Sequence, residues 1–241
     1  METNKQSHPI LYSCLALVVI CIIAFLSLVM YYAWVQKYGK PMKKNELYER
    51  FRTKPGSTKK ITHRVSAIKT PTKSMIHSHN PSFGKKDAPI TMLIFVDFDC
   101  PFCKKAAPGL NNLMDTYKEP IRFVFKHLPV EYIHPEAKKA AIAAQCAHEQ
   151  NAFLPYYDEL FANTTRDENT LLLHAKSLSL DIETFAKCLQ SPHILYQIEQ
   201  DLKDAITLDI GGTPAYSINQ KKIEGEPSAA EWKTLIINSL Q

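Results

Sequence analysis

The chain has 241 residues, with 29 lysines and arginines against 24 aspartates and glutamates and a formal net charge of +5. This length allows one medium-sized domain with an accessory segment, or two small domains. Much of the positive charge lies between Lys37 and Lys69, so it belongs to one segment and we expect no nucleic-acid partner. Six cysteines are too few for a disulfide scaffold of this size, so their placement carries the information.

An uncharged segment lies near the N-terminus. Pro9–Gln36 contains no charged side chain and ends with Tyr31, Tyr32 and Trp34. A helix needs about 20 apolar residues to cross a bilayer, and aromatic residues suit the headgroup boundary. We therefore expect residues 1–36 to form a retained, single-pass membrane anchor. A cleavable signal peptide is the main alternative, although its apolar stretch should be shorter.

Residues 37–81 follow the anchor. They contain scattered Lys, Arg, Ser, Thr and Pro, few large apolar residues and no sustained periodicity, which predicts a flexible basic linker. His77 and His79 have a spacing that metal ligands can use, but this polar segment supplies no partner ligands. We interpret them as solvated histidines and expect no metal site.

From Ala88 onward the chain alternates between apolar runs typical of buried strands and segments with helical periodicity. The expected elements are a strand at Pro89–Phe98, a helix at Pro101–Tyr117, a strand at Ile121–His127, a helix at Pro135–Glu149, three or four helices between Phe153 and Leu208, a hairpin of Ala215–Asn219 with Lys222–Glu224, and a helix at Ser228–Leu240. This order predicts an α/β architecture with a helical insertion.

The stretch Cys100–Cys103, with Pro101 and Phe102 between the cysteines, lies where a strand ends and a helix begins. A cysteine at a helix N-terminus experiences the partial positive charge of unpaired N–H groups, which favours its thiolate. Pro101 suits the first helical position, where its missing N–H costs nothing. We expect the exposed sulfur of Cys100 to form a mixed disulfide with a substrate, which Cys103 then resolves.

Two other interpretations of this pair are a structural pair and half of a zinc site. A zinc site would need two further ligands with suitable spacing. The other cysteines outside the anchor, Cys146 and Cys188, are isolated rather than paired. The strand-to-helix position therefore favours redox chemistry.

A second motif, Gly211-Gly212-Thr213-Pro214, directly precedes the expected hairpin. The Thr213–Pro214 bond is a candidate cis peptide, and Pro214 can open a strand because a missing donor is tolerated there. Such a bond would leave the preceding backbone groups free to pair with an extended substrate. Taken by itself, the motif could equally be an ordinary turn before an edge strand.

Together these residues resemble the DsbA-like thioredoxin-fold family. The matching stretches, in the family's order, are Asp87–Thr91, Val96–Cys103, Ile121–Pro129, His134–Ala137, Gly212–Pro214 and Ile218–Trp232. The resemblance covers residues 82–241 and implies a thioredoxin fold with a helical domain inserted at about 134–209. It also implies a redox centre at Cys100 and Cys103, without a cofactor, beside a cis-proline loop at Thr213 and Pro214.

Two positions depart from the family. Many relatives carry an acidic residue six positions before the first redox cysteine, where this chain has Ile94. Strongly oxidising relatives have a histidine between the cysteines, where this chain has Phe102. Phenylalanine offers the thiolate neither a charge nor a hydrogen bond, so our hypothesis is that Cys100 is less acidic, and the centre less oxidising, than in those relatives.

Some relatives also carry a second, structural disulfide in the inserted domain. By this resemblance we predict a bridge between Cys146 and Cys188, with two buried free thiols as the alternative.

The resemblance implies a thiol–disulfide oxidoreductase that acts on bacterial envelope proteins and depends on a DsbB-like membrane partner or on a reductase. The alternative is a non-catalytic thioredoxin-fold binding or chaperone module of an envelope complex. We expect a bacterial inner-membrane protein with a periplasmic catalytic domain, because this chemistry needs an oxidising compartment. The basic residues that follow the anchor disagree, since the positive-inside rule alone would place this domain in the cytoplasm.

Overall fold

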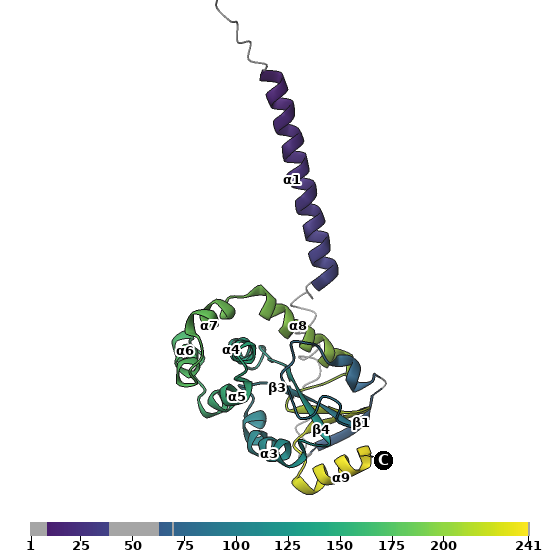
Figure 1. Ribbon diagram of the computed structural model, residues 1–241. Coiled ribbons are helices and arrows are strands. Elements are labelled where there is room, and N and C mark those ends of the chain that lie inside the picture. The colour runs from purple at the N-terminus through teal and green to yellow at the C-terminus, as the bar shows by residue number, and fades with distance from the viewer. Residues whose placement is uncertain (1–8, 39–62, 69, 241) are drawn as a thin grey trace, which may run out of the picture. The chain divides into compact units, whose positions relative to one another are not determined.

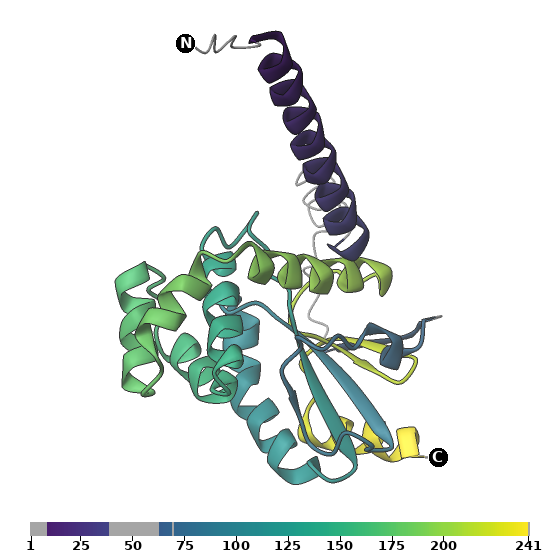
Figure 2. The same cartoon turned by 45° about the horizontal axis from the view of Figure 1, so that its top comes forward.

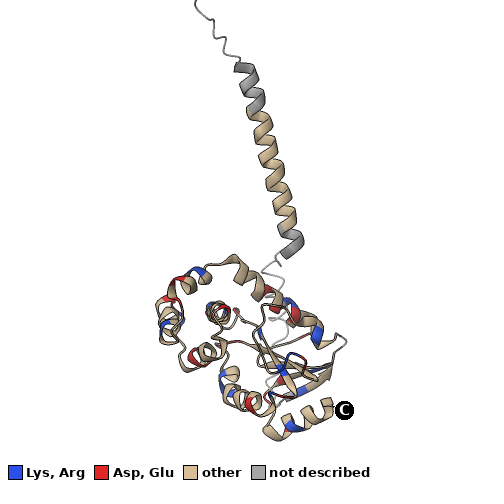
Figure 3. Cartoon of the chain, in the orientation of Figure 1, with Lys and Arg blue, Asp and Glu red and all other residues tan. Residues whose placement is uncertain are grey.

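A computed structural model describes residues 9–38, 63–68 and 70–240. The chain divides into two units, Met1–Pro41 and Met42–Gln241, which we describe separately. In the first unit, α1 spans Pro9–Tyr38 and is long and apolar enough to cross a membrane. Figure 3 shows no charged residue in the part of α1 whose side chains are described. The helix therefore agrees in length and composition with the expected anchor.

The second unit is built on a six-stranded sheet (Figure 1). Its spatial order is β1-β6-β5-β3-β4-β2, in which β3 and β4 are parallel and all other neighbours are antiparallel. The strands are β1 (His63–Ala67), β2 (Ser82–Phe83), β3 (Ile90–Val96), β4 (Ile121–His127), β5 (Ala215–Ile218) and β6 (Lys221–Gly225). All seven residues of β3 are buried, as expected for a central strand covered on both faces.

Helices cover both faces of this sheet. Figures 1 and 2 show α8 on one face, α3 and α9 on the other, and α4 to α7 grouped beside the sheet. The helices are α3 (Pro101–Tyr117), α4 (Ala137–Glu149), α5 (Phe153–Ala162), α6 (Glu168–Ser177), α7 (Ile182–Leu189), α8 (Pro192–Thr207) and α9 (Ala229–Leu240). The strand–helix–strand start, helical block and final hairpin and helix follow the expected α/β order. The sheet and the inserted helices together form the expected α/β architecture with a helical insertion.

The expected linker is wrong at its C-terminal end. His63–Ala67 forms the edge strand β1 and pairs antiparallel with β6, and Thr72–Met75 forms a short 3-10 helix with Thr72 and Met75 buried. The folded unit therefore includes residues well before Ser82. An edge strand bonds to one neighbour only, and the described side chains of β1 are exposed or half-buried, so no apolar alternation marks it in the sequence. Residues 39–62 of the expected linker lie outside the described residues.

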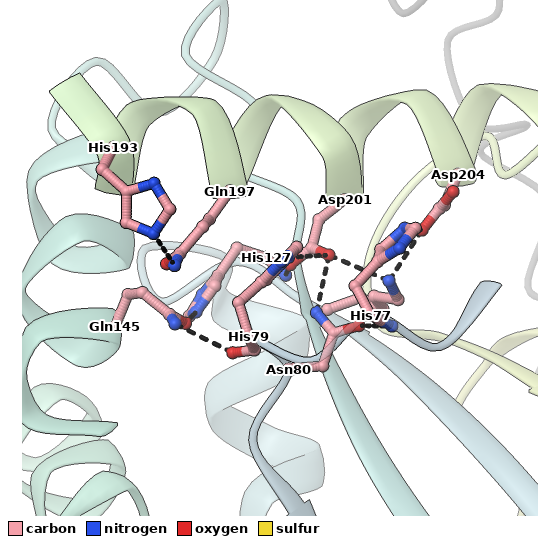
Figure 4. A network of polar contacts seen from close by, with 10 residues as sticks. His77, His79, Asn80, His127, Gln145, His193, Gln197, Asp201 and Asp204 are labelled. Carbon is pink, nitrogen blue, oxygen red and sulfur yellow. Dashed lines mark hydrogen bonds and ion pairs between the residues drawn. The ribbon is translucent and has the colours of Figure 1, made fainter. Parts of the chain in front are cut away.

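The interpretation of His77 and His79 as solvated is also wrong. Their rings stack with centroids 5.2 Å apart, and both Nε2 atoms face carboxylates of α8 (Figure 4). His77 lies 2.8 Å from Asp204 Oδ2, and His79 lies 3.4 Å from Asp201 Oδ1. The two carboxylates are spaced one helical turn apart on α8, so they can hold both histidines at once.

Lys126 of β4 is the cation at the centre of this network. Its side chain is 0% exposed, and its Nζ donates to Asp201 Oδ1 at 3.0 Å and to Asp204 Oδ2 at 2.7 Å. The side chain of Asn80 and the backbone N–H of His127 also donate to Asp201. We call Lys126, Asp201, Asp204 and the groups bonded to them the polar network. It fastens the segment before β2 to α8 and to the end of β4.

Candidate active site

The two cysteines of the CxxC motif lie at the N-terminus of α3. Cys100 is the residue that caps this helix, with extended backbone angles, and Pro101 occupies its first turn. The Cys100 N–H donates to the carbonyl oxygen of Asp97, which closes the turn between β3 and α3. Cys103 follows one turn later, and the structure holds both cysteines as free thiols. The helix therefore begins at the predicted residue, and both cysteine sulfurs lie at its N-terminal end.

The expectation that Cys100 is exposed is wrong for the residue as a whole, which is 4% exposed. Pro101 and Phe102, directly after it, are exposed, and Phe102 retains 67% of its accessible surface. Cys103 is buried at 2%. Cys100 thus lies just beneath the surface at the helix end, and a substrate would have to reach its sulfur beside Phe102.

The environment separates the two thiols in acidity. A hydrogen bond from the Cys103 thiol lowers the pKa of Cys100 to about 6, although burial acts in the opposite direction. The Thr213 side chain and the N–H groups of Cys103 and Phe102 contribute to this lowering, the N–H groups as expected at a helix N-terminus. Burial, and then the neighbouring Cys100, raise the pKa of Cys103 well above its usual value. At neutral pH the arrangement provides one thiolate and one thiol.

The Gly211–Pro214 motif contacts the first of these cysteines. The Thr213–Pro214 peptide bond is cis, and β5 begins directly after it. The Cys100 thiol donates to the carbonyl oxygen of Thr213 at 3.3 Å. The alternative of an ordinary turn is therefore wrong, because this loop packs against the sulfur of Cys100.

Asp97 organises the turn that leads to Cys100, which the sequence did not reveal. Its buried carboxylate accepts from the Asp99 N–H at 2.8 Å, from the Val130 N–H at 2.9 Å and from His134 Nδ1 at 2.8 Å. His134 therefore joins the loop after β4 to the turn before Cys100. The turn before Cys100 is thus held by side-chain bonds as well as by its own backbone.

Ile94, the position that departs from the acidic pattern, lies inside β3. It is buried and opposite Tyr216 of β5 and Phe125 of β4. Burial raises the pKa of Tyr216 beyond its usual range, and Tyr157 behaves in the same way. Both phenols therefore stay protonated, so the side chains around Cys103 at the position of Ile94 carry no charge.

The other two cysteines of the unit form the expected pair. Cys146 of α4 and Cys188 of α7 are joined by a disulfide, with Cα atoms 5.7 Å apart. The bridge links two helices of the insertion. It lies in other elements than Cys100 and Cys103, so the four cysteines form two separate pairs. Within the residues that the structure describes, no group of three or more His, Cys, Asp or Glu side chains is placed to hold a metal ion.

A mixed sheet with helices on both faces, a CxxC motif at a helix start and a cis-proline loop against the first cysteine define a protein of the thioredoxin class. The chain belongs to the thioredoxin family, because the family model described as Thioredoxin matches residues 77–238.

Known proteins are similar to this chain over the same unit. A thioredoxin-like oxidoreductase from Silicibacter pomeroyi is 22% identical, with a TM-score of 0.62 over 68% of this chain and 94% of that one. BdbD from Bacillus subtilis is 24% identical, with a TM-score of 0.61 over 73% and 98%. At these identities the likeness establishes the fold.

A curated relative, the Na(+)/H(+) antiporter NhaA 3 of Salinispora tropica, is 36% identical over 145 residues. The match covers 59% of this chain but only 22% of that protein. The similarity to this relative is therefore to a minor part of its length.

Proposed function

We propose that this protein is a membrane-anchored thiol–disulfide oxidoreductase in which Cys100 is the nucleophile and Cys103 the resolving thiol. The observation that carries the proposal is the placement of both cysteines at the start of α3 beside the cis Thr213–Pro214 bond, with the Cys100 thiol 3.3 Å from the Thr213 carbonyl oxygen. In these surroundings the pKa of Cys100 is lowered to about 6 and that of Cys103 is raised. A thiolate is the attacking species in disulfide exchange. The centre would therefore present its nucleophile at neutral pH and keep its second thiol protonated until it is needed.

The exchange balances without a cofactor. The Cys100 thiolate attacks a substrate disulfide, a sulfur–sulfur bond forms to one substrate sulfur, and the other leaves as a thiolate. Cys103 then gives its proton to the substrate thiolate that has left and attacks Cys100, which releases the second substrate thiolate and leaves Cys100–Cys103 oxidised. Two electrons pass from the cysteine pair to the substrate. In the reverse direction a substrate dithiol is oxidised, and a membrane partner of the DsbB type would have to reoxidise the pair.

The surface around Cys100 favours protein substrates. Phe102 is exposed beside the sulfur, and Tyr132 and Ile133 are exposed in the loop that His134 ties to Asp97. A contiguous exposed apolar surface marks a site that binds other chains, and under this proposal these three side chains supply it. The Thr213 carbonyl, beside the cis-proline, could additionally accept from the backbone of an extended segment.

The compartment we propose is the non-cytoplasmic side of a bacterial membrane. The Cys146–Cys188 disulfide supports it, because such bridges persist in oxidising compartments. The apolar helix α1 would hold the domain at the membrane.

The test uses the full-length chain in detergent, assayed for insulin reduction and for oxidative refolding of a reduced substrate protein. Cys100→Ser should reduce both activities to the level of the protein-free reaction. Cys103→Ser should accumulate a mixed disulfide with substrate, visible on a non-reducing gel. The double variant Cys146→Ala/Cys188→Ala is the matched control and should keep its activity while folded. A wild-type protein no more active than Cys100→Ser in both assays would favour the binding-module alternative.

A further inference from the structure

A buried arginine of the helical insertion contacts the segment before Cys100. Arg166 lies between α5 and α6, and its side chain is 1% exposed. Its Nε–H donates to Asp99 Oδ1 at 2.9 Å, and an Nη2–H donates to the Phe98 carbonyl oxygen at 3.2 Å. Phe98 and Asp99 are the two residues that directly precede Cys100. One side chain therefore fixes both a carboxylate and a backbone carbonyl next to the nucleophile.

The remaining donors of Arg166 bind the insertion itself. Nη2 also donates to the Leu160 carbonyl oxygen at 2.8 Å, and Nη1 donates to the carbonyl oxygen of Asn163. Because a guanidinium holds its donors in a rigid, planar fork, these bonds fix the end of α5 relative to the start of α3. Lysine could not make the same set of bonds from a single ammonium group.

The position of Asp99 gives this clamp an electrostatic consequence. Its carboxylate belongs to the residue next to the thiol that has to ionise, and a nearby like charge disfavours a thiolate. Arg166 places an opposite charge against that carboxylate. Its bond to Phe98 also holds the backbone leading into α3, whose N–H groups at Phe102 and Cys103 face the sulfur of Cys100.

We infer that Arg166 is a positioning residue of the redox centre, which holds Asp99 and the Phe98 carbonyl so that the Cys100 thiolate forms without an unbalanced carboxylate beside it. The inference rests on the proposed function, because it assigns Arg166 to the nucleophile of that reaction. The inference gives the helical insertion a role in the ionisation of Cys100, in addition to its packing beside the sheet. The sequence carried no pattern for it, since Arg166 and Asp99 are separated by 67 positions.

The experiment measures the rate at which iodoacetamide alkylates Cys100 in the reduced full-length protein between pH 4 and 9, by mass spectrometry of the peptide that contains it. Arg166→Gln should lower this rate at pH 5 about fivefold, because an unopposed carboxylate raises the pKa of the thiol. The double variant Asp99→Asn/Arg166→Gln, which removes both charges, should return to within about twofold of the wild type. Arg122→Gln is the matched control, since Arg122 bonds Ser82 on β2, and should leave the rate unchanged.

A folded Arg166→Gln protein with an unchanged pH profile, even if less stable, would show that Arg166 is structural and overturn the inference. A double variant as slow as Arg166→Gln alone would also overturn it. If Arg166→Gln does not fold, the single variant Asp99→Asn decides the question. Because it removes the negative charge next to the thiol, it should speed Cys100 alkylation at pH 5 about two- to fivefold. A rate equal to or below that of the wild type refutes the inference. Alkylation needs no substrate, so an inactive wild type in the insulin assay would count against the proposed function and not against Arg166.

Discussion

The polar network and the proposed redox centre are both buried and both stabilise the charged form of an acid, but they do so with different groups. In the network, burial acts to raise the pKa of Asp201, but the Lys126 ammonium and the neighbouring histidines hold it well below its usual range. In the redox centre, a thiol, the Thr213 side chain and backbone N–H groups stabilise the Cys100 thiolate. The network uses a full opposite charge where the centre uses neutral donors.

The two arrangements therefore serve different purposes: the network stabilises the fold, and the surroundings of Cys100 make its thiol reactive. A buried carboxylate bonded to an ammonium keeps its charge across the physiological pH range and changes little with conditions. A thiol held by neutral donors, with a pKa of about 6, gains or loses its proton near neutrality. The first arrangement suits a fastening between elements, and the second suits a nucleophile that is consumed and regenerated.

The largest effect should come from removing the cation of the network. Lys126→Met leaves the carboxylates of Asp201 and Asp204 buried without their ammonium partner, so we expect a loss of about 4 kcal/mol in the free energy of unfolding. Urea denaturation of the wild type and the variant measures this loss. Cys100 alkylation should keep its pH profile in the folded variant, because the network serves stability.

Two comparisons sharpen this prediction. Lys139→Met removes a lysine whose ion pair with Glu136 is exposed, so its cost should be within experimental error of zero. The triple variant Lys126→Met/Asp201→Asn/Asp204→Asn removes the unpaired charges as well and should recover part of the lost stability. A triple variant less stable than Lys126→Met alone would mean that charge pairing is not what the network contributes.

The elements next to the redox centre could be predicted from the sequence because local patterns specify them. The helix at Pro101–Tyr117 and the strand at Ile121–His127 have the predicted bounds. Pro101 marks the helix start, and the continuous apolar run within Pro89–Phe98 marks β3, a strand buried on both faces. The sequence also specified which cysteines lie at a helix N-terminus.

Features that depend on distant partners could not be predicted in this way. His77 and His79 were interpreted as solvated because their partners on α8 lie more than 120 positions away. The edge strand β1 lacked an apolar pattern, and the Cys100 thiol donates its hydrogen bond to a loop 113 positions later. In each case the property belongs to a pair of segments, and neither segment displays it alone.

The next effect concerns the thiolate itself. The pKa of Cys100 is lowered from 9.0 to about 6 on folding, so the unfolded chain binds more protons than the folded one between these values. The resulting stabilisation is complete above pH 9 and is lost as the pH falls through 6, and it amounts to about 4 kcal/mol at most. Unfolding of the reduced protein should therefore show a steeper rise in stability from pH 6 to 9 than unfolding of Cys100→Ser. Parallel curves for the two proteins would mean that folding does not favour the thiolate.

The smallest effect lies at the edge of the network. Burial lowers the pKa of His127 to about 4, and Nδ1 of this histidine has no hydrogen-bond partner among the described residues. The unfolded chain takes up this proton near pH 6.5 and the folded chain only near pH 4, so stability falls as the pH drops across that window. The loss should be about 3 kcal/mol, and His127→Gln should abolish it.

Unfolding free energies of the wild type and His127→Gln at pH 7 and pH 4 give this difference directly. His148, whose pKa burial also lowers, is present in both proteins and cancels from the comparison. His127 bonds Gln145 and contacts Phe98, so the same titration tests whether the network and the centre are independent. If they are, Cys100 alkylation in His127→Gln will follow the wild-type pH profile. A shifted profile would show that His127 affects the pKa of Cys100 through Phe98. The network and the proposed centre would then not be independent.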